Sequence, residues 1–162
     1  MNIPTQSDWQ AKAAALRFPH QAFIDGKHVD ALSGATFDAL SPIDGAVLAK
    51  VARCDGADVD RAVQVARRAF ESGRWSDTKP THRKKVLVKF AQLIHDHREE
   101  LALLEALDMG KPVMDAMNVD VAASVRCMSW TGEAIDKVYG EVAATGSDEL
   151  GLRHFAITVR VG

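Results

Sequence analysis

The sequence predicts an α/β chain in which a short helix is followed by short antiparallel strands, then by amphipathic helices and last by a strand-like tail. Three observations support this order. Turn residues separate short strand-like runs in residues 22–52. Apolar residues recur at helical spacing between residues 55 and 139. In residues 155–161 apolar residues alternate with other types, as in a strand with one covered face.

The first predicted element is a short helix. Ser7 followed by Gln10 forms a capping-box pattern, which predicts a helix from Asp8 to Phe18. Pro19 cannot continue this helix and is expected to end it.

The next residues predict a small antiparallel β unit. Phe23–Val29 reads as a strand, a turn at Asp25-Gly26 and a return strand. Thr36–Leu40 and Val47–Val51 read as two further strands. Between them, Ser41–Gly45 has the sequence Ser-Pro-Ile-Asp-Gly, which is turn chemistry.

Two amphipathic helices are predicted after the strands. Asp55 can cap a helix that runs to about Ser72 and ends at Gly73. Its apolar stripe consists of Val59, Val63, Ala66 and Phe70. Pro80 fits the first turn of the second helix, which ends near His97. The apolar face of this helix holds Val86, Phe90 and Leu93.

Glu99–Asp108 predicts a further helix with Leu101 and Leu104 directed inward, followed by the stop signals Gly110 and Pro112. A long helix, Val113–Tyr139, is then expected to end at Gly140. Its core-facing stripe includes Met114, Met117 and Met128. Beyond it we expect a strand over Glu141–Thr145, a loop over residues 146–151 and a strand that contains Phe155, Ile157, Val159 and Val161.

The composition is that of a globular protein. Hydrophobic residues make up 47% and charged residues 26% of the 162 residues, and the formal net charge is -2. This charge gives no electrostatic reason to expect nucleic acid or a membrane surface as a partner. Two cysteines are too few for a disulfide framework, and no run reaches the ~18 apolar residues of a membrane span. With no signal peptide pattern, we expect a cytoplasmic location.

Few residues suggest chemistry by themselves. Cys54 precedes a predicted helix N-terminus, which can activate a thiol, but no base accompanies it in a recognisable arrangement. Cys127 is expected to pack as a small apolar side chain. His95 and His97 would point to different faces of a helix, so they do not indicate a metal site.

Other residues are also better explained by structure than by a site. The acidic residues Asp55, Asp58 and Asp60 fit a helix N-terminus. The tryptophans Trp75 and Trp130 are expected to pack rather than to form a stacking platform. Neither a Gly-x-Gly-x-x-Gly pattern nor a P-loop occurs. We therefore predict no catalytic and no cofactor-binding residue in these 162 residues.

Several segments resemble the aldehyde dehydrogenase family in one continuous register from Phe23 to Leu152. Phe23–Gly26 matches the opening strand motif of the family, and Ser41–Gly45 resembles its Asn-Pro-x-x-Gly turn. Leu104–Pro112 matches its Glu-Thr-Leu-Asp-Thr-Gly-Lys-Pro segment with two changes. Residues 133–141 are most similar to bacterial members that act on γ-glutamyl-γ-aminobutyraldehyde and 4-guanidinobutyraldehyde in polyamine and arginine breakdown.

The resemblance implies a place in a larger fold. Residues 1–20 would be an N-terminal helical extension, and residues 21–140 part of a Rossmann-like cofactor domain, with the β unit first and its outer helices after it. Residues 141–162 would begin an oligomerisation hairpin. After Leu152 the sequence departs from the Thr-Arg-Glu-Pro-Val-Gly run that is usual in the family. The domain would therefore be incomplete here.

The resemblance also implies a function and a cation site. The complete enzyme would be a homo-oligomer that oxidises an aldehyde with NAD or NADP, and its cysteine nucleophile and catalytic glutamate would lie beyond Gly162. A monovalent cation would bind the carboxylate of Asp108 and the backbone carbonyls of Ala39 and Leu40.

Two hypotheses follow for these residues. In the first, they are the N-terminal part of an aldehyde dehydrogenase, inactive and loosely packed when alone. In the second, they form a short, non-catalytic interaction module that pairs with the sheet edge of a full-length paralogue.

Overall fold

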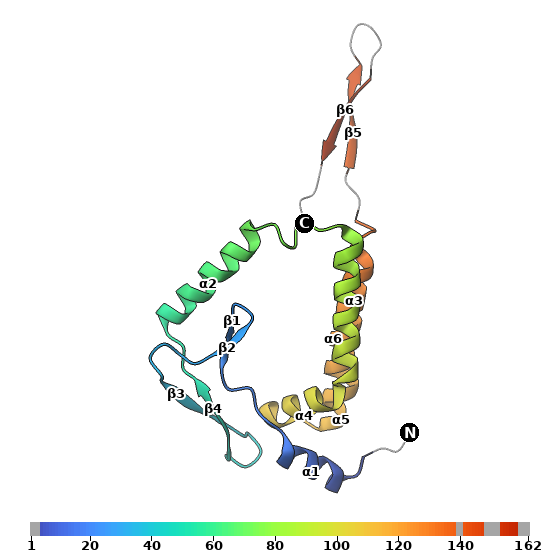
Figure 1. Ribbon diagram of the computed structural model, residues 1–162. Coiled ribbons are helices and arrows are strands. Elements are labelled where there is room, and N and C mark those ends of the chain that lie inside the picture. Colours follow the sequence, from blue (N-terminus) through green and yellow to red (C-terminus); the bar gives the residue numbers. More distant parts are fainter. Residues whose placement is uncertain (1–3, 139–140, 148–152, 159–162) are drawn as a thin grey trace.

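A computed structural model describes residues 4–138, 141–147 and 153–158, and these residues form the mixed α/β arrangement that the sequence predicts (Figure 1). The elements in chain order are α1 (Gln6–Ala15), β1 (Ala22–Ile24), β2 (Lys27–Val29), β3 (Thr36–Leu40), β4 (Val47–Ala52), α2 (Gly56–Glu71), α3 (Pro80–Asp96), α4 (Arg98–Met109), α5 (Val113–Asp115), the π-helix η1 (Ala116–Val121), α6 (Ala122–Ala134), β5 (Glu141–Ser147) and β6 (Arg153–Thr158).

The first helix is capped two residues earlier than predicted. Thr5, not Ser7, is the N-cap of α1. The Thr5 hydroxyl accepts the Asp8 backbone N–H at 3.3 Å, and the Asp8 carboxylate accepts the Thr5 N–H at 2.7 Å. Both patterns are capping boxes, so the sequence alone did not choose between them. The helix also ends at Ala15, before Phe18.

The four N-terminal strands confirm the predicted β unit. Asp25 and Gly26 form the turn between β1 and β2 with φ values of 57° and 72°, as a two-residue hairpin turn requires. Strands β3 and β4 pair antiparallel on either side of the predicted Ser41–Gly45 turn. Within this unit the strands pair as two separate two-stranded sheets.

Helix α2 has the predicted ends. The Asp55 carboxylate accepts the backbone N–H of Ala57 at 2.9 Å, and Gly73 follows the helix with φ of 67°. The predicted apolar stripe, however, lies on the surface: Val59 is 56%, Val63 59% and Phe70 74% exposed. Among the described residues, no other helix or strand packs along α2.

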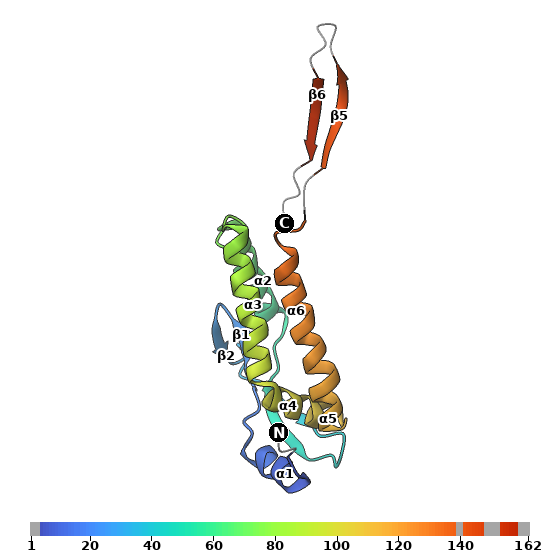
Figure 2. The same ribbon diagram turned by 90° about the vertical axis from the view of Figure 1, so that its right-hand side faces the viewer.

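Helices α3 and α6 lie side by side and form the main helix pair (Figures 1 and 2). Gly132 of α6 allows the close approach, because a Cβ atom there would lie 3.2 Å from the Leu87 Cβ and 3.2 Å from the Val88 Cγ2 of α3. Ala91 of α3 is also buried. The face of α3 that the sequence pattern singled out, with Val86, Phe90 and Leu93, is 40–48% exposed.

The small core lies where α4 meets the π-helix. Ala102 of α4, Ala116 and Val121 are buried together, and Met117 packs against them as the predicted methionine stripe requires. On α4 the prediction that Leu101 points inward was wrong: Leu101 is exposed, Leu104 is half-buried, and the buried residues are Ala102, Leu103 and Ala106. A core made largely of alanines buries little apolar area.

The predicted helix Val113–Tyr139 is interrupted by a π-helical turn and ends earlier, at Ala134. Tyr139 and Gly140 lie outside the described residues.

Strands β5 and β6 form an antiparallel hairpin, with Glu141 opposite Thr158 and Ser147 opposite Arg153. This confirms both predicted strands as far as they are described, but Gly146 and Ser147, predicted as loop, belong to β5, because the pairing with β6 continues to Arg153. Residues 148–151 of the predicted loop, Val159 and Val161 lie outside the described part. Figures 1 and 2 show the hairpin standing away from the helices and from β1–β4. In the described part of the chain, no helix is long and apolar enough to cross a membrane.

Candidate functional site

The end of α4 packs against the turn that follows β3. Gly110, the C-cap of α4, has φ of 71°, and its N–H donates to the Ala106 carbonyl at 2.9 Å. A Cβ atom at Gly110 would lie only 2.9 Å from the Pro42 Cγ. Asp108 precedes Gly110 by two residues and Leu40 precedes Pro42 by two, so this junction brings together the two segments that the predicted cation site needs.

The turn in this junction is held by its own hydrogen bonds. Ser41 is 5% exposed, and its hydroxyl accepts the Ile43 N–H at 3.2 Å. Its carbonyl accepts the Gly45 N–H at 2.8 Å. The Asp44 carboxylate accepts the Ala46 N–H at 3.1 Å, which holds the pKa of Asp44 below its usual range. The serine that replaces the usual asparagine therefore still closes the turn.

The donors at the junction suit a hard monovalent cation. Ala39 pairs with Ala49 and Leu40 with Val47, so Leu48 bulges out of the ladder beside the two predicted carbonyl ligands. Asp108 is exposed in the last turn of α4. Carboxylate and carbonyl oxygens are the ligands that such cations prefer. Among the described residues, no group of three or more His, Cys, Asp or Glu side chains could hold a metal ion.

The other candidate residues have structural explanations or none. Cys54 and Cys127 are both exposed, so the expectation that Cys127 packs in the interior was wrong. His97 lies between α3 and α4, with its Nδ1 3.6 Å from a Glu100 carboxylate oxygen. The tryptophans expected to pack are largely uncovered in the described part of the chain: Trp75 is 46% and Trp130 72% exposed.

Asp58 has a second structural role besides the predicted one at the N-terminus of α2. It is 2% exposed, and its carboxylate accepts the Asp55 N–H at 3.1 Å in the capping box of α2. The same carboxylate accepts the Leu32 N–H at 3.0 Å. Asp58 therefore ties the first turn of α2 to the loop after β2. No sequence pattern links positions 32 and 58.

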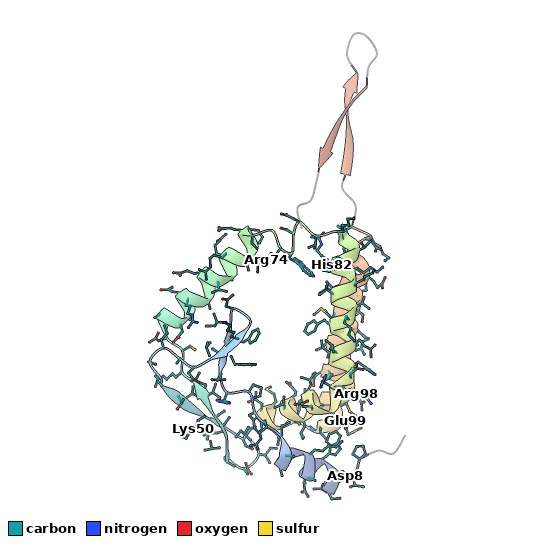
Figure 3. The ribbon with its side chains drawn as sticks, viewed as in Figure 1. Asp8, Lys50, Arg74, His82, Arg98 and Glu99 are labelled. Carbon is teal, nitrogen blue, oxygen red and sulfur yellow. The ribbon has the colours of Figure 1, made fainter. Side chains whose placement is uncertain are left out.

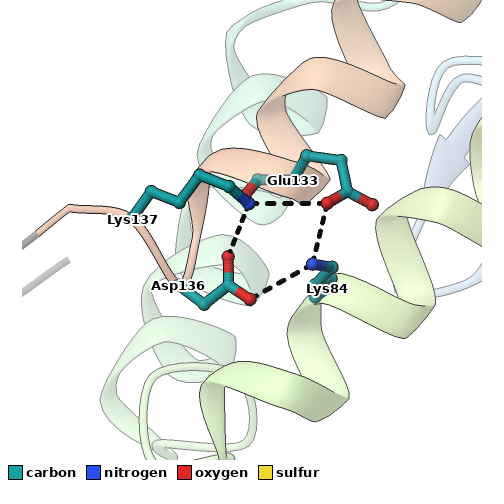
Figure 4. Close-up of polar contacts among 4 residues, drawn as sticks. All are labelled: Lys84, Glu133, Asp136 and Lys137. Carbon is teal, nitrogen blue, oxygen red and sulfur yellow. Dashed lines mark hydrogen bonds and ion pairs between the residues drawn. The ribbon is translucent and has the colours of Figure 1, made fainter.

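An ion network joins α3 to the last turns of the α6 segment (Figure 4). The Lys84 ammonium lies 2.8 Å from Glu133 and 3.1 Å from Asp136, and Lys137 lies 3.5 Å and 3.0 Å from the same two carboxylates. Hydrogen bonds from Glu133 and then Asp136 raise the pKa of Lys84. Lys84 is the main cause of the lowered pKa of Glu133, and Lys137 and then Lys84 lower the pKa of Asp136. This network was not predicted from the sequence, although Glu133 and Lys137 have the i, i+4 spacing of a helical ion pair.

The network predicts that the stability of the fold depends on pH. A lowered carboxyl pKa stabilises the fold above the ordinary value of about 4, and the effect is lost as the pH falls through the lowered value. Lys84 is charged throughout the acid range, as any lysine is, so only the carboxylates of the network titrate there. We expect the α3–α6 pair to lose stability below pH ~4. In Lys84→Met this loss of stability at acid pH should be smaller. The temperature of thermal unfolding, measured between pH 3 and 7 for the unchanged protein and for Lys84→Met, tests this. Lys85→Met is the control. An equal loss of stability at acid pH in all three proteins would contradict the prediction.

A second ion pair fixes the segment after α4. The Lys111 ammonium pairs with Asp120 of η1, and this hydrogen bond raises the pKa of Lys111. The lysine of the Gly-Lys-Pro segment is thus held against the π-helix.

An open pocket of about 660 Å³ lies between α1 and the start of α4. The Lys12–Glu99 ion pair spans it, and its lining also includes Arg17, Asp96 and Arg98. Figure 3 shows Arg98 and Glu99 at this place, whereas Lys50, Arg74 and His82 lie on other elements. The lining has mixed charge and, among the described residues, no cysteine or serine, so it offers no thiol or serine hydroxyl as a nucleophile.

Sequence comparison relates this chain to known enzymes. The sequence model of the aldehyde dehydrogenase family matches residues 28–161. The NADP/NAD-dependent aldehyde dehydrogenase PuuC of Escherichia coli is 46% identical over 152 residues, which are 94% of this chain and 31% of that protein. The aminoacetaldehyde dehydrogenase of Pseudomonas aeruginosa is 43% identical over 148 residues, which are 91% of this chain and 30% of that protein.

Structural comparison gives the same relationship. The crystal structure of a γ-glutamyl-γ-aminobutyraldehyde dehydrogenase from Burkholderia cenocepacia matches with a TM-score of 0.85 and 55% sequence identity. The match covers 86% of this chain and 28% of the crystallised one. The chain thus spans about 30% of the length of the relatives that it matches.

Proposed function

The chain belongs to the aldehyde dehydrogenase family, and from this premise we propose that its residues serve an NAD(P)-dependent enzyme that oxidises an aldehyde to the carboxylate. The observation that carries the proposal is the continuous match over residues 28–161. The relatives named for aminoacetaldehyde and γ-glutamyl-γ-aminobutyraldehyde support an aldehyde with an amino or amide nitrogen as the substrate, and a guanidino aldehyde stays a prediction from the sequence.

In this proposal the described residues support the fold of the enzyme and supply none of its reacting groups. The reaction needs a thiolate that attacks the aldehyde carbon, a donor for the oxyanion, a hydride acceptor and a carboxylate that activates water. These groups belong to the 70% or so of the enzyme that the chain does not span. We therefore expect no dehydrogenase activity from these 162 residues by themselves.

The domain division follows from the same proposal. Residues 1–20 are a helical extension, residues 21–140 are part of the cofactor domain, and residues 141–162 begin the hairpin through which the complete enzyme forms a homo-oligomer. The amphipathic helices α2 and α3 support the second assignment, because helices of this kind cover a sheet in α/β domains. The β5–β6 hairpin that stands away from the helices supports the third (Figure 2).

A chimaera tests the proposed function. Residues 1–152 replace the matching first part of the Escherichia coli relative, and aldehyde-dependent NADH and NADPH formation are measured with γ-aminobutyraldehyde and with acetaldehyde. We expect activity, with a preference for the amino aldehyde. A folded, oligomeric chimaera without dehydrogenase activity would contradict the proposal.

The same hairpin favours a second candidate function. Each strand of β5–β6 is an edge strand within the described residues, and such an edge can add to a partner's sheet. The chain would then be a non-catalytic module that pairs with a full-length paralogue. Co-purification with a full-length enzyme whose own hairpin is intact favours this candidate, and elution apart from that enzyme excludes it.

The cation site is a further part of the proposal. Asp108 and the carbonyls of Ala39 and Leu40 bind a monovalent cation in the complete enzyme, and the contact between Gly110 and Pro42 supports this set. We expect the chimaera to melt at a higher temperature in KCl or NaCl than in tetramethylammonium chloride at equal ionic strength. Asp108→Asn should abolish the difference, and Asp115→Asn should keep it. A difference that survives in Asp108→Asn would contradict the site.

A further inference from the structure

A second pocket, of about 460 Å³, lies where the end of α3 and the start of α4 meet η1 and α6. We call it the α4–α6 pocket. Figure 3 shows Arg98 and Glu99, which take part in its lining, at the junction of α3 and α4. None of the described residues that line it belongs to the predicted cation site or to the ion network around Lys84. Its volume lies within the range of about 300–1,000 Å³ that is typical of small-molecule sites.

The covered part of the lining is apolar. It consists of Met114, Met117, Val121 and Val125. Val121 is 6% exposed, and the other three side chains are half-buried. Methionine side chains are flexible and adapt to apolar groups of different shapes. This part of the pocket therefore suits a short hydrocarbon chain.

The polar part of the lining carries more positive than negative charge. Arg98 from the first turn of α4 and Arg126 from α6 bring two guanidinium groups to the pocket. Among the described lining residues Glu99 supplies the one carboxylate, and it pairs with Lys12 of α1. No carboxylate of the described residues forms an ion pair with Arg98 or Arg126. The pocket therefore has an excess of positive charge that a bound anion would balance.

The two arginines suit a carboxylate in particular. The Arg98 Nη1 group donates to the His95 carbonyl at 3.2 Å, which holds this guanidinium group beside the pocket. A guanidinium group can bind a carboxylate through two parallel hydrogen bonds. The pocket thus combines groups that bind an anionic head with a surface that binds an apolar tail.

We propose that the α4–α6 pocket binds a small carboxylate with an apolar tail, of which octanoate is a representative. The carboxylate pairs with Arg126 and Arg98, and the tail lies against Met114 and Met117. The positive charge of the arginines disfavours an amine with the same tail, and a carboxylate without a tail lacks the apolar contact. This inference goes beyond the proposed function, because it requires none of the reacting groups of a dehydrogenase.

Nuclear magnetic resonance of the methionine methyl groups tests the proposal at single residues. The 162-residue chain is labelled with ¹³C at these methyl groups and titrated with octanoate, and each signal is assigned by substitution of its methionine with leucine. We expect the Met114 and Met117 signals to shift with a dissociation constant on the order of 1 mM, as is usual for a ligand of this size. Met109 is 63% exposed but does not line the pocket, so its signal should not shift.

Two further probes separate the contribution of the tail from that of the charge. Octylamine has the same tail with the opposite charge, and acetate has the carboxylate without the tail. We expect each of them to shift the Met114 and Met117 signals only at concentrations about tenfold higher or more. Equal affinity for octanoate and octylamine, or for octanoate and acetate, would overturn the proposal.

Matched variants locate the carboxylate. Arg126→Gln should weaken octanoate binding about fivefold or more, because it removes a charge-assisted hydrogen bond. Arg126→Lys keeps the charge and should weaken binding less than about threefold. Arg61→Gln makes the same change at an exposed position of α2, outside the lining, and should leave binding unchanged. The spectrum of each variant without octanoate checks that the fold is retained.

Three results of these titrations would also contradict the proposal. The first is that the Met114 and Met117 signals do not move with octanoate. The second is an equal shift of Met109, which would show that octanoate spreads over exposed apolar residues instead of entering the pocket. The third is equal weakening by Arg126→Gln and Arg61→Gln. None of these results bears on dehydrogenase activity, so the chimaera tests the proposed function independently.

Discussion

Asp58→Ala should detach the first turn of α2 from the strand unit and raise the hydrogen-exchange rates of the amides of α2 by up to about a hundredfold. The Asp58 side chain is 2% exposed, and its carboxylate accepts the N–H groups of Leu32 and Asp55. Alanine leaves both donors without this acceptor. Hydrogen bonds to a charged group contribute about 1.5–3 kcal/mol each, so we expect a loss of about 3 kcal/mol.

The control for this prediction is Asp60→Ala. Asp60 lies in the same part of α2 but is exposed, so its removal changes the local charge and leaves both hydrogen bonds intact. We expect exchange in α2 to change less than about threefold for this variant. Similar effects of the two substitutions would show that the charge, and not the two bonds of Asp58, sets the stability of this helix.

Gly132→Leu should separate α3 from α6 where Gly132 lies against Leu87 and Val88. A Cβ atom at this position already lies 3.2 Å from atoms of Leu87 and Val88, and leucine adds three carbon atoms beyond it. Overpacking of this kind costs about 1–3 kcal/mol, whereas the better helix propensity of leucine recovers less than about 1 kcal/mol. We expect amide exchange in the middle of α3 and α6 to increase about tenfold.

Two comparisons sharpen this test. Gly132→Ala should be close to neutral, because its gain in helix propensity offsets a displacement of a few tenths of an ångström. Gly56→Leu makes the same change as Gly132→Leu at the start of α2, where no atom lies within 4 Å of the added Cβ. If Gly132→Leu disturbs the helices no more than Gly56→Leu does, then the close packing of α3 on α6 is not what holds this pair together.

The sequence predicted the local features of the fold well. The Asp25-Gly26 turn, the Asp55 cap and the stop at Gly110 follow from the backbone geometry or hydrogen bonding of single residues, and each lies where it was predicted. The error at α1 has the same local origin. Thr5 and Ser7 each begin a capping pattern, and the neighbouring residues do not decide between them.

The packing of the helices was predicted less well, because it depends on partners outside the pattern. Periodicity correctly found an apolar face on α3, with Val86, Phe90 and Leu93, but the covered face is the one that contains Ala91. A small residue such as alanine or Gly132 marks a close helix contact only when the second helix is known. The π-helical turn at Ala116–Val121 likewise had no signal in the spacing of the methionines.

The candidate site was predicted from family resemblance rather than from a pattern in the residues. Leu40 and Asp108 are far apart in the sequence, and the packing of Gly110 on Pro42 connects their segments. The ion network around Lys84 could be predicted in part from the sequence, because Glu133 and Lys137 are one helical turn apart. Its connection to α3 required the helix pair itself.

The central claim is that α2 and α3 present apolar faces that need the rest of an aldehyde dehydrogenase to cover them. Urea unfolding of the 162-residue polypeptide alone, followed by circular dichroism at two protein concentrations, tests it most directly. The claim predicts a broad transition that shifts with protein concentration, because the uncovered faces weaken packing and promote association. A sharp transition that is independent of concentration, from a monomer, would contradict it.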